Sequence, residues 1–139
     1  MKLKVISALC LLLAVLIYSC QNDNDITFKR YYTTGKVIYT TQCENCHGAD
    51  GQGLSALMPP LTDTAFLRKN KAALSCFVKY GLKDKILIVN KKAYDSDMPP
   101  TDLAPIEIAE VLTYTGNSFG NNQGLITSQQ VEAELLKCK

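Results

Sequence analysis

Eight residues set the expectation for the whole 139-residue chain: Thr41-Gln42-Cys43-Glu44-Asn45-Cys46-His47-Gly48. Within them, Cys43-x-x-Cys46-His47 has the spacing that attaches a c-type haem. Two thiols one helical turn apart can each form a thioether with a haem vinyl group, which leaves the next residue beneath the iron. We therefore predict that Cys43 and Cys46 anchor a haem and that His47 is its proximal iron ligand.

Other chemistries use the same two cysteines. A thioredoxin-type dithiol should follow a strand in a βαβ pattern, and no such pattern surrounds residues 43–46. A structural zinc site would need Cys76 and Cys138 as further ligands, at spacings that are long and unpaired compared with those of zinc modules. The remaining alternative is a chance pentapeptide, so the flanking residues must decide.

The length and the N-terminal residues limit the architecture. The chain is long enough for one domain with one core. Lys2 and Lys4, an apolar run over residues 5–18 and then Ser19-Cys20 predict an export signal over residues 1–19. An uncleaved signal anchor is the alternative. The ending Leu16-Ile17-Tyr18-Ser19-Cys20 resembles the lipobox of bacterial lipoproteins, so we expect lipid on Cys20 to tie the protein to a membrane.

We expect residues 20–32 to be a polar tether and residues 33–139 to form the folded domain. The whole chain has 15 basic and 13 acidic residues, and the predicted signal takes two lysines away, which leaves a formally neutral mature chain. Neutrality removes any nucleic-acid footprint, so we expect no nucleic-acid partner. In an oxidising compartment, Cys76 and Cys138 are expected either to form a disulfide or to remain as one buried and one frayed terminal thiol.

Local signals predict helices interrupted by one small hairpin. The first helix should begin near Thr33 or Thr34 and run through Tyr39 into the haem motif. Capping residues, apolar periodicity and β-prone runs predict the remaining elements, which are a short helix after residues 62–63, a longer one over 70–81, a hairpin over 86–94, a helix over 105–117 and a last helix from residue 128.

The iron ligands are assigned partly by elimination. Proline lacks an N–H, so we expect the free Pro59 carbonyl to accept a hydrogen bond from the outer nitrogen of His47. His47 is the single histidine of the sequence, and methionine is the common alternative as a distal ligand. Met58 lies beside the proximal prolines, whereas Met98 follows a long excursion and is stiffened by Pro99-Pro100, so we predict Met98. The plainer alternatives are a surface turn at the prolines and a methionine that merely fills the core.

Taken together, these residues resemble a class I cytochrome c of the small bacterial monohaem type over about residues 34–122. Gly35, Tyr39 and Tyr114 match the positions where the family's first helix meets the helix after the methionine. Phe119 stands where tryptophan is common. The elements that carry the resemblance are Gly35–Tyr39, Cys43–Gly48, Pro59–Leu61, Val89–Tyr94, Met98-Pro99, Ile108–Tyr114 and Phe119–Asn121.

The resemblance implies an all-α cytochrome c fold, with four to five helices around one covalent haem c and a short hairpin before the methionine ligand. It adds Pro59 and Leu61 to the residues expected to contact the haem. It implies an electron carrier rather than an enzyme, tethered in the bacterial cell envelope or periplasm, with an oxidase, reductase or dehydrogenase as its redox partner. The alternative is a haem-based catalyst or gas sensor in which the methionine is displaced.

Overall fold

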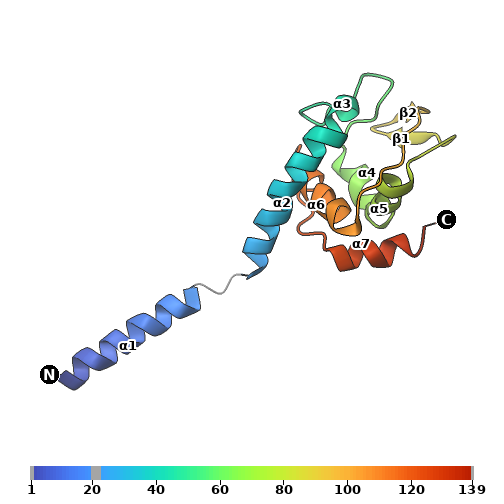
Figure 1. Cartoon of the computed structure of the whole chain (residues 1–139). Helices are drawn as coiled ribbons and strands as arrows, with labels where there is room; N and C mark the ends of the chain where they lie inside the picture. The colour runs from blue at the N-terminus through green and yellow to red at the C-terminus, as the bar shows by residue number, and fades with distance from the viewer. Residues whose placement is uncertain (1, 20–22, 139) are drawn as a thin grey trace.

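The structure is a computed structural model that describes residues 2–19 and 23–138. Figure 1 shows α2, α5, α6 and α7 packed into one body, with α1 standing apart from it. A two-stranded antiparallel hairpin completes this mostly helical architecture, as expected for the all-α class. In chain order the elements are α1 Lys2–Ser19, α2 Asp23–Gln42, α3 Glu44–His47, α4 Thr64–Lys69, α5 Lys71–Tyr80, β1 Leu87–Val89, β2 Lys92–Tyr94, α6 Pro105–Thr115 and α7 Ser128–Leu135.

Helix α1 spans the residues expected to be the export signal, and its side chains are exposed wherever they are described. Of the helices within the described residues, none combines the length and the apolarity needed to cross a membrane. Cys20, the expected lipidation site, lies outside the described residues.

Helix α2 begins at Asp23, about ten residues before the start expected from Thr33 and Thr34. The expectation of a polar tether up to residue 32 is therefore wrong for residues 23–32. The physical reason is aromatic packing, because Tyr31 is buried in the main core and the ring of Tyr32 stacks 5.9 Å from that of Phe28. These aromatic residues recur at helical spacing and extend the buried face of α2 toward its N-terminus.

Helices α2 and α6 cross with little space between them. At the crossing, a Cβ atom added to Gly35 would lie 2.0 Å from the carbonyl oxygen of Glu110 and 2.9 Å from Cβ of Tyr114. The rings of Tyr39 and Tyr114 lie 5.3 Å apart beside this point, and Phe119 lies 5.3 Å from Tyr39. The absence of a side chain at residue 35 therefore allows the two backbones to approach, and the aromatic rings cover the contact.

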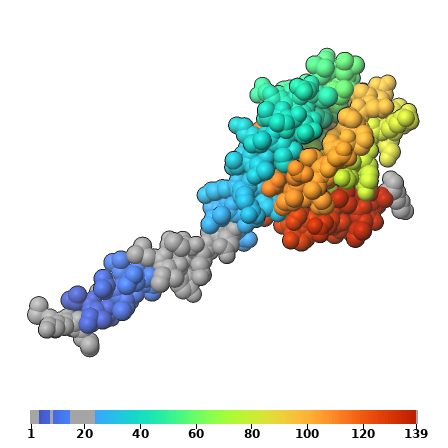
Figure 2. All heavy atoms as spheres, in the orientation of Figure 1, coloured from blue at the N-terminus to red at the C-terminus, as the bar shows by residue number. Residues whose placement is uncertain are grey.

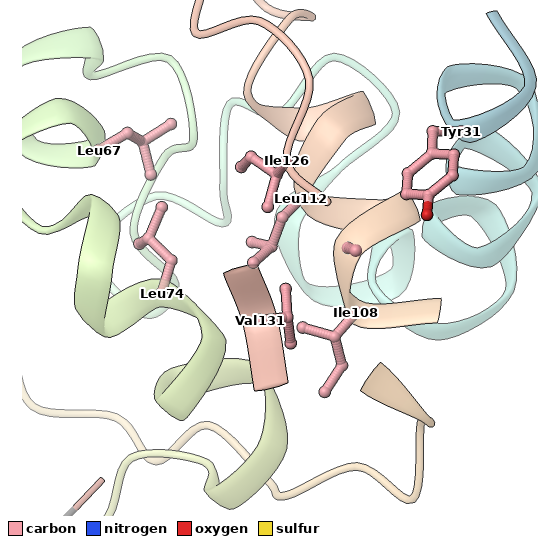
Figure 3. Close-up of a cluster of buried hydrophobic side chains, with 8 residues drawn as sticks. Tyr31, Leu67, Leu74, Ile108, Leu112, Ile126 and Val131 are labelled. Atoms are coloured by element: carbon pink, nitrogen blue, oxygen red, sulfur yellow. The ribbon is translucent and has the colours of Figure 1, made fainter. Parts of the chain in front are cut away.

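The main core forms where α6 meets α2, α4, α5 and α7. Figure 3 shows side chains from all of these helices converging on Ile108 and Leu112 of α6. Ile108 and Val131 are fully buried, and burial of such side chains stabilises the fold by about 1.5–3 kcal/mol each. The buried members are Tyr31, Leu67, Leu74, Ile108, Ala109, Leu112, Ile126 and Val131.

Helix α7, in red along the lower edge of the packed part in Figure 2, is fixed to α5 in two ways. The first is a hydrogen bond at 2.5 Å from the buried Ser75 hydroxyl of α5 to the Glu134 carboxylate of α7. Gln130, which also lies on α7, donates to the same carboxylate at 3.0 Å and helps to hold it in place. Cys76 and Cys138 are joined by a disulfide. Cys138 lies just beyond the end of α7, which is at Leu135.

Capping residues begin the remaining helices close to the expected positions. Asp63 accepts from Phe66 N–H at the start of α4, and Glu107 accepts from Ala104 N–H at the start of α6. Thr127, which the sequence reasoning overlooked, accepts from Gln130 N–H at the start of α7. In the hairpin, Leu87 pairs with Tyr94 and Val89 with Lys92, so the predicted hairpin is confirmed.

Candidate haem-binding site

An apolar pocket opens between α3, the hairpin and the face formed by α5 and α6. Its empty volume is about 1310 Å³ when the part open to solvent is included. The residues predicted to bind haem, namely Cys43, Cys46, His47, Pro59, Leu61 and Met98, all line it. Further lining residues that sequence reasoning did not assign to the site include Phe77, Leu82, Leu87, Tyr94 and Val111.

The two cysteines lie at one side of this pocket, at the start and within the single turn of α3. Cys43 is half-buried and Cys46 is exposed, and among the described cysteines both are free thiols. Burial, reinforced by the nearby Cys46 thiol, raises the pKa of Cys43 to about 11. A thioredoxin-type dithiol requires a lowered cysteine pKa, so this environment does not fit the dithiol alternative.

His47 is oriented by a backbone acceptor. Its Nδ1 lies 3.1 Å from the carbonyl oxygen of Pro59, the acceptor that the sequence suggested. A carbonyl cannot donate, so Nδ1 carries the hydrogen and Nε2 keeps a free lone pair. Burial lowers the pKa of His47 and thereby favours the neutral imidazole that a metal requires.

The loop after His47 folds back to deliver Pro59. The N–H of Gly53 donates to the His47 carbonyl at 2.8 Å, and the N–H of Leu61 donates to the Gly51 carbonyl at 2.7 Å. Gly53 has φ +69°, and a Cβ atom there would lie 2.3 Å from the carbonyl oxygen of Met58. Glycine is required at residue 53 both for its left-handed backbone and for this close approach.

Met98 is held at the pocket by a second segment, which likewise combines a left-handed glycine with a backbone bridge between a leucine and a methionine. Leu82 and Met98 exchange two backbone hydrogen bonds, of 2.8 and 2.9 Å. Gly81, which has φ +71°, packs so closely that an added Cβ atom would lie 2.3 Å from the carbonyl oxygen of Met98. Leu54 and Met58 form the corresponding bridge in the first segment.

A Gly-Leu pair thus holds a Met-Pro-Pro segment twice in the same chain. The signal that could have revealed it is Gly53-Leu54 before Met58-Pro59-Pro60 and Gly81-Leu82 before Met98-Pro99-Pro100. The two intervening stretches differ greatly in length, and this difference hides the correspondence. The first segment orients His47, and the second brings Met98 to the pocket.

Met58 also lines the pocket, and its sulfur lies 3.9 Å from the Ser96 hydroxyl. The same hydroxyl donates to the Leu57 carbonyl. The loop that bears Met58 is therefore joined to the chain just before Met98. Met98 lines the same pocket, and both methionines are held by backbone bridges. Met58 directly precedes Pro59, whose carbonyl accepts from His47, whereas Met98 lies on a separate segment, so Met98 stays the predicted distal ligand.

The donor set and its surroundings fit a covalently attached haem. Two free thiols, one neutral imidazole and the thioethers of Met58 and Met98 surround a pocket with a mostly apolar lining. The zinc alternative lacks its ligands, because Cys76 and Cys138 are bonded to each other. Over the described residues, no group of three or more His, Cys, Asp and Glu side chains is arranged to hold a metal ion.

Comparison with known proteins agrees with this site. The chain matches a family model described as Cytochrome c over residues 32–117, which is more than half of its length. No curated protein matches the chain. Members of the matched family carry covalently attached haem c in a mostly helical domain, and such domains are typically extracytoplasmic electron carriers. The match, the Cys43-x-x-Cys46-His47 motif and the pocket that it lines show that this chain belongs to the cytochrome c family.

Proposed function

We propose that this protein is a single-electron carrier with one haem, whose iron His47 and Met98 would both ligate. The observation that carries the proposal is that one apolar pocket is lined by both a neutral, oriented imidazole and a methionine from a distant, rigidly anchored segment. Two protein ligands saturate the iron and leave no position for a substrate or a gas. This property distinguishes a carrier from a catalyst or a sensor.

When bound, the haem supplies an iron that alternates between the ferrous and ferric states. Cys43 and Cys46 would hold it covalently, and Pro59 would fix the ring plane of His47 through Nδ1. Phe77, Leu82 and the other apolar lining residues would exclude water. Ligands that are already held by the backbone need little rearrangement between oxidation states, which favours fast electron transfer.

A redox titration of the haem-loaded protein tests the carrier function. We expect one transition that follows one-electron behaviour, and we expect the ferrous spectrum to be unchanged when carbon monoxide is added, since Met98 occupies the distal position. A ferrous protein that binds carbon monoxide readily would contradict the proposal and would favour a gas sensor or a catalyst instead.

We also propose that the carrier works from a membrane surface outside the cytoplasm, tethered by lipid on Cys20. The support is the lipobox-like Leu16–Cys20 sequence, and the chemistry is the burial of several acyl chains at about 0.8 kcal/mol per CH₂. Redox proteins of the same compartment, such as an oxidase, a reductase or a dehydrogenase, would then be its partners.

Fractionation of cells that express Cys20→Ala tests the tether. We expect the variant to leave the membrane fraction and to lose the mass of the lipid, while its haem spectrum stays that of the wild type. Unchanged processing and membrane partition would show that Cys20 is not the anchor.

A further inference from the structure

The backbone of Met98 packs against the chain that follows the C-terminal end of α5. Gly81 follows the helix directly, and Leu82 forms the two-bond bridge to Met98. Because a Cβ atom on Gly81 would lie 2.3 Å from the carbonyl oxygen of Met98, the two backbones are in direct contact. A displacement of the end of α5 would therefore move Met98.

The chain beyond Met98 is fastened to the same helix end. Thr101 donates its hydroxyl hydrogen to the Val78 carbonyl at 2.9 Å and its N–H to the Lys79 carbonyl at 3.3 Å. The Lys79 ammonium in turn donates to the carbonyl of Leu103 at 3.0 Å. Carbonyls in the last turn of a helix lack partners within the helix, so these bonds serve as its cap. The segment from Met98 to Leu103 and the end of α5 thus form one unit.

The disulfide holds this unit to the rest of the protein. Cys76 lies on α5 between Ser75, which is fully buried, and Phe77, which lines the haem pocket. Its partner Cys138 follows α7, which is fixed in the main core by Val131. The bond therefore connects α5, the helix against whose end Met98 is held, to the C-terminal segment, at a point less than two helical turns before Gly81.

We propose that the Cys76–Cys138 disulfide is a positioning element for Met98, so that its reduction loosens Met98 in the haem pocket. A dithiol reductant would transfer two electrons and two protons, yielding two cysteine thiols and an oxidised, disulfide-bonded reductant. The proposal rests on the proposed function, in which Met98 is the distal ligand. Neither cysteine touches the reacting atoms, and both act through α5.

The test compares full-length, haem-loaded ferric proteins, with imidazole as the competing ligand. In the double variant Cys76→Ala/Cys138→Ala we expect imidazole to bind about 5- to 150-fold more tightly, the range that such couplings span. The near-infrared charge-transfer band from sulfur to ferric iron should weaken in parallel. The reason is that imidazole affinity rises with the fraction of molecules in which Met98 has left the iron.

Two further variants separate positioning from general stability. Thr101→Val retains the disulfide but removes the hydroxyl bond to Val78, so it should also strengthen imidazole binding. If the double variant does not accumulate, Cys138→Ala alone breaks the disulfide and takes its place in the comparison. Tyr31→Ala loosens the main core at α2, away from α5, α7 and the lining of the haem pocket. We expect it to lower the free energy of unfolding while leaving imidazole affinity and the near-infrared band unchanged.

The outcomes distinguish this proposal from the proposed function. A double variant with wild-type imidazole affinity and a full near-infrared band would overturn the positioning role and leave Met98 as ligand. An equal gain of imidazole affinity in Tyr31→Ala would overturn it as well, because general loosening of the core would then suffice. A wild-type protein without the band, whose imidazole affinity is unaltered by Met98→Ala, would instead overturn the proposed function.

Discussion

At the scale of single residues, Asp63 joins two elements beside the haem pocket. One carboxylate oxygen accepts from Phe66 N–H in the first turn of α4 at 3.0 Å, and the other accepts from Asn90 N–H in the hairpin turn at 2.8 Å. The Phe66 bond is the largest cause that lowers the pKa of Asp63. Burial opposes it to a lesser extent, and the Asn90 bond adds a smaller lowering effect. A lowered pKa means that folding favours the charged form.

We predict that Asp63→Ala lowers the free energy of unfolding by about 1 kcal/mol near neutral pH, a typical value for a lost N-cap. The carboxylate contributes fully above the pKa of the unfolded state, and its contribution disappears as the pH falls through the lower folded-state pKa. The difference between variant and wild type in urea unfolding should therefore shrink in acid. Asp95→Ala, at an exposed carboxylate, is the control and should change stability by less than about 0.5 kcal/mol. A loss that is the same at both pH values would contradict this account of Asp63.

Gly81 is the second residue whose change has a definite expected result. In Gly81→Ala the new Cβ atom meets the backbone of Met98 in addition to the strain of φ +71°. Gly124→Ala is a matched control, since Gly124 has φ +75° and nothing within 4 Å of the added atom. The control should lose only about 1–2 kcal/mol for its left-handed backbone. Gly81→Ala should lose more and should also weaken the near-infrared band, and equal losses with an intact band would show that the contact with Met98 is unimportant.

At the scale of elements, the helix propensity of residue 35 in α2 and its packing against α6 favour different residues. Alanine is favoured over glycine within a helix by about 1 kcal/mol, so an isolated α2 would gain from Gly35→Ala. In the folded protein the added methyl group would overlap the Glu110 carbonyl, and such overpacking typically costs about 1–3 kcal/mol. The helix crossing, rather than helix propensity, should therefore decide the sign of the change.

We predict that Gly35→Ala destabilises the protein by at least about 1 kcal/mol net of its propensity gain, as measured by urea unfolding. The control is Thr34→Ala, one residue earlier on the exposed side of α2, which should be neutral or stabilising by a few tenths of a kcal/mol. If Gly35→Ala were as stable as the control, then the close approach of α2 and α6 would be wrong.

The same helix shows how far sequence reasoning reaches for elements. Local signals located α4, α5, α6 and the hairpin, because Asp63, Pro105 and Gly81 act on their immediate neighbours. The start of α2 was placed too late, because the residues before Thr33 are mostly polar and Tyr31 gains its burial from α6. Tertiary packing overrides local signals at such positions, and a single sequence does not reveal the partner surface.

At the scale of the whole molecule, the residues of the candidate haem site are easier to predict from the sequence than the backbone contacts that hold them in place. The haem motif is local, and a single histidine with few methionines left a short list of ligands. The backbone anchors of Pro59 and Met98 were not foreseen, because Gly53 and Gly81 are each held against segments that only the fold brings to them. The residues that bind the haem are thus predictable from short motifs, whereas the groups that position them are spread over α5, the loops and the disulfide and become visible only in the fold.

The central claim is that His47 and Met98 together saturate the haem iron, and the near-infrared spectrum of the ferric protein tests it most directly. We predict the sulfur-to-iron charge-transfer band in the wild type and in Met58→Ala, and its loss in Met98→Ala. The Met98→Ala variant should also have a lower reduction potential and should bind carbon monoxide in the ferrous state, because a thioether ligand favours ferrous iron and blocks the distal position. A wild type without the band, or its loss in Met58→Ala but not in Met98→Ala, would contradict the account.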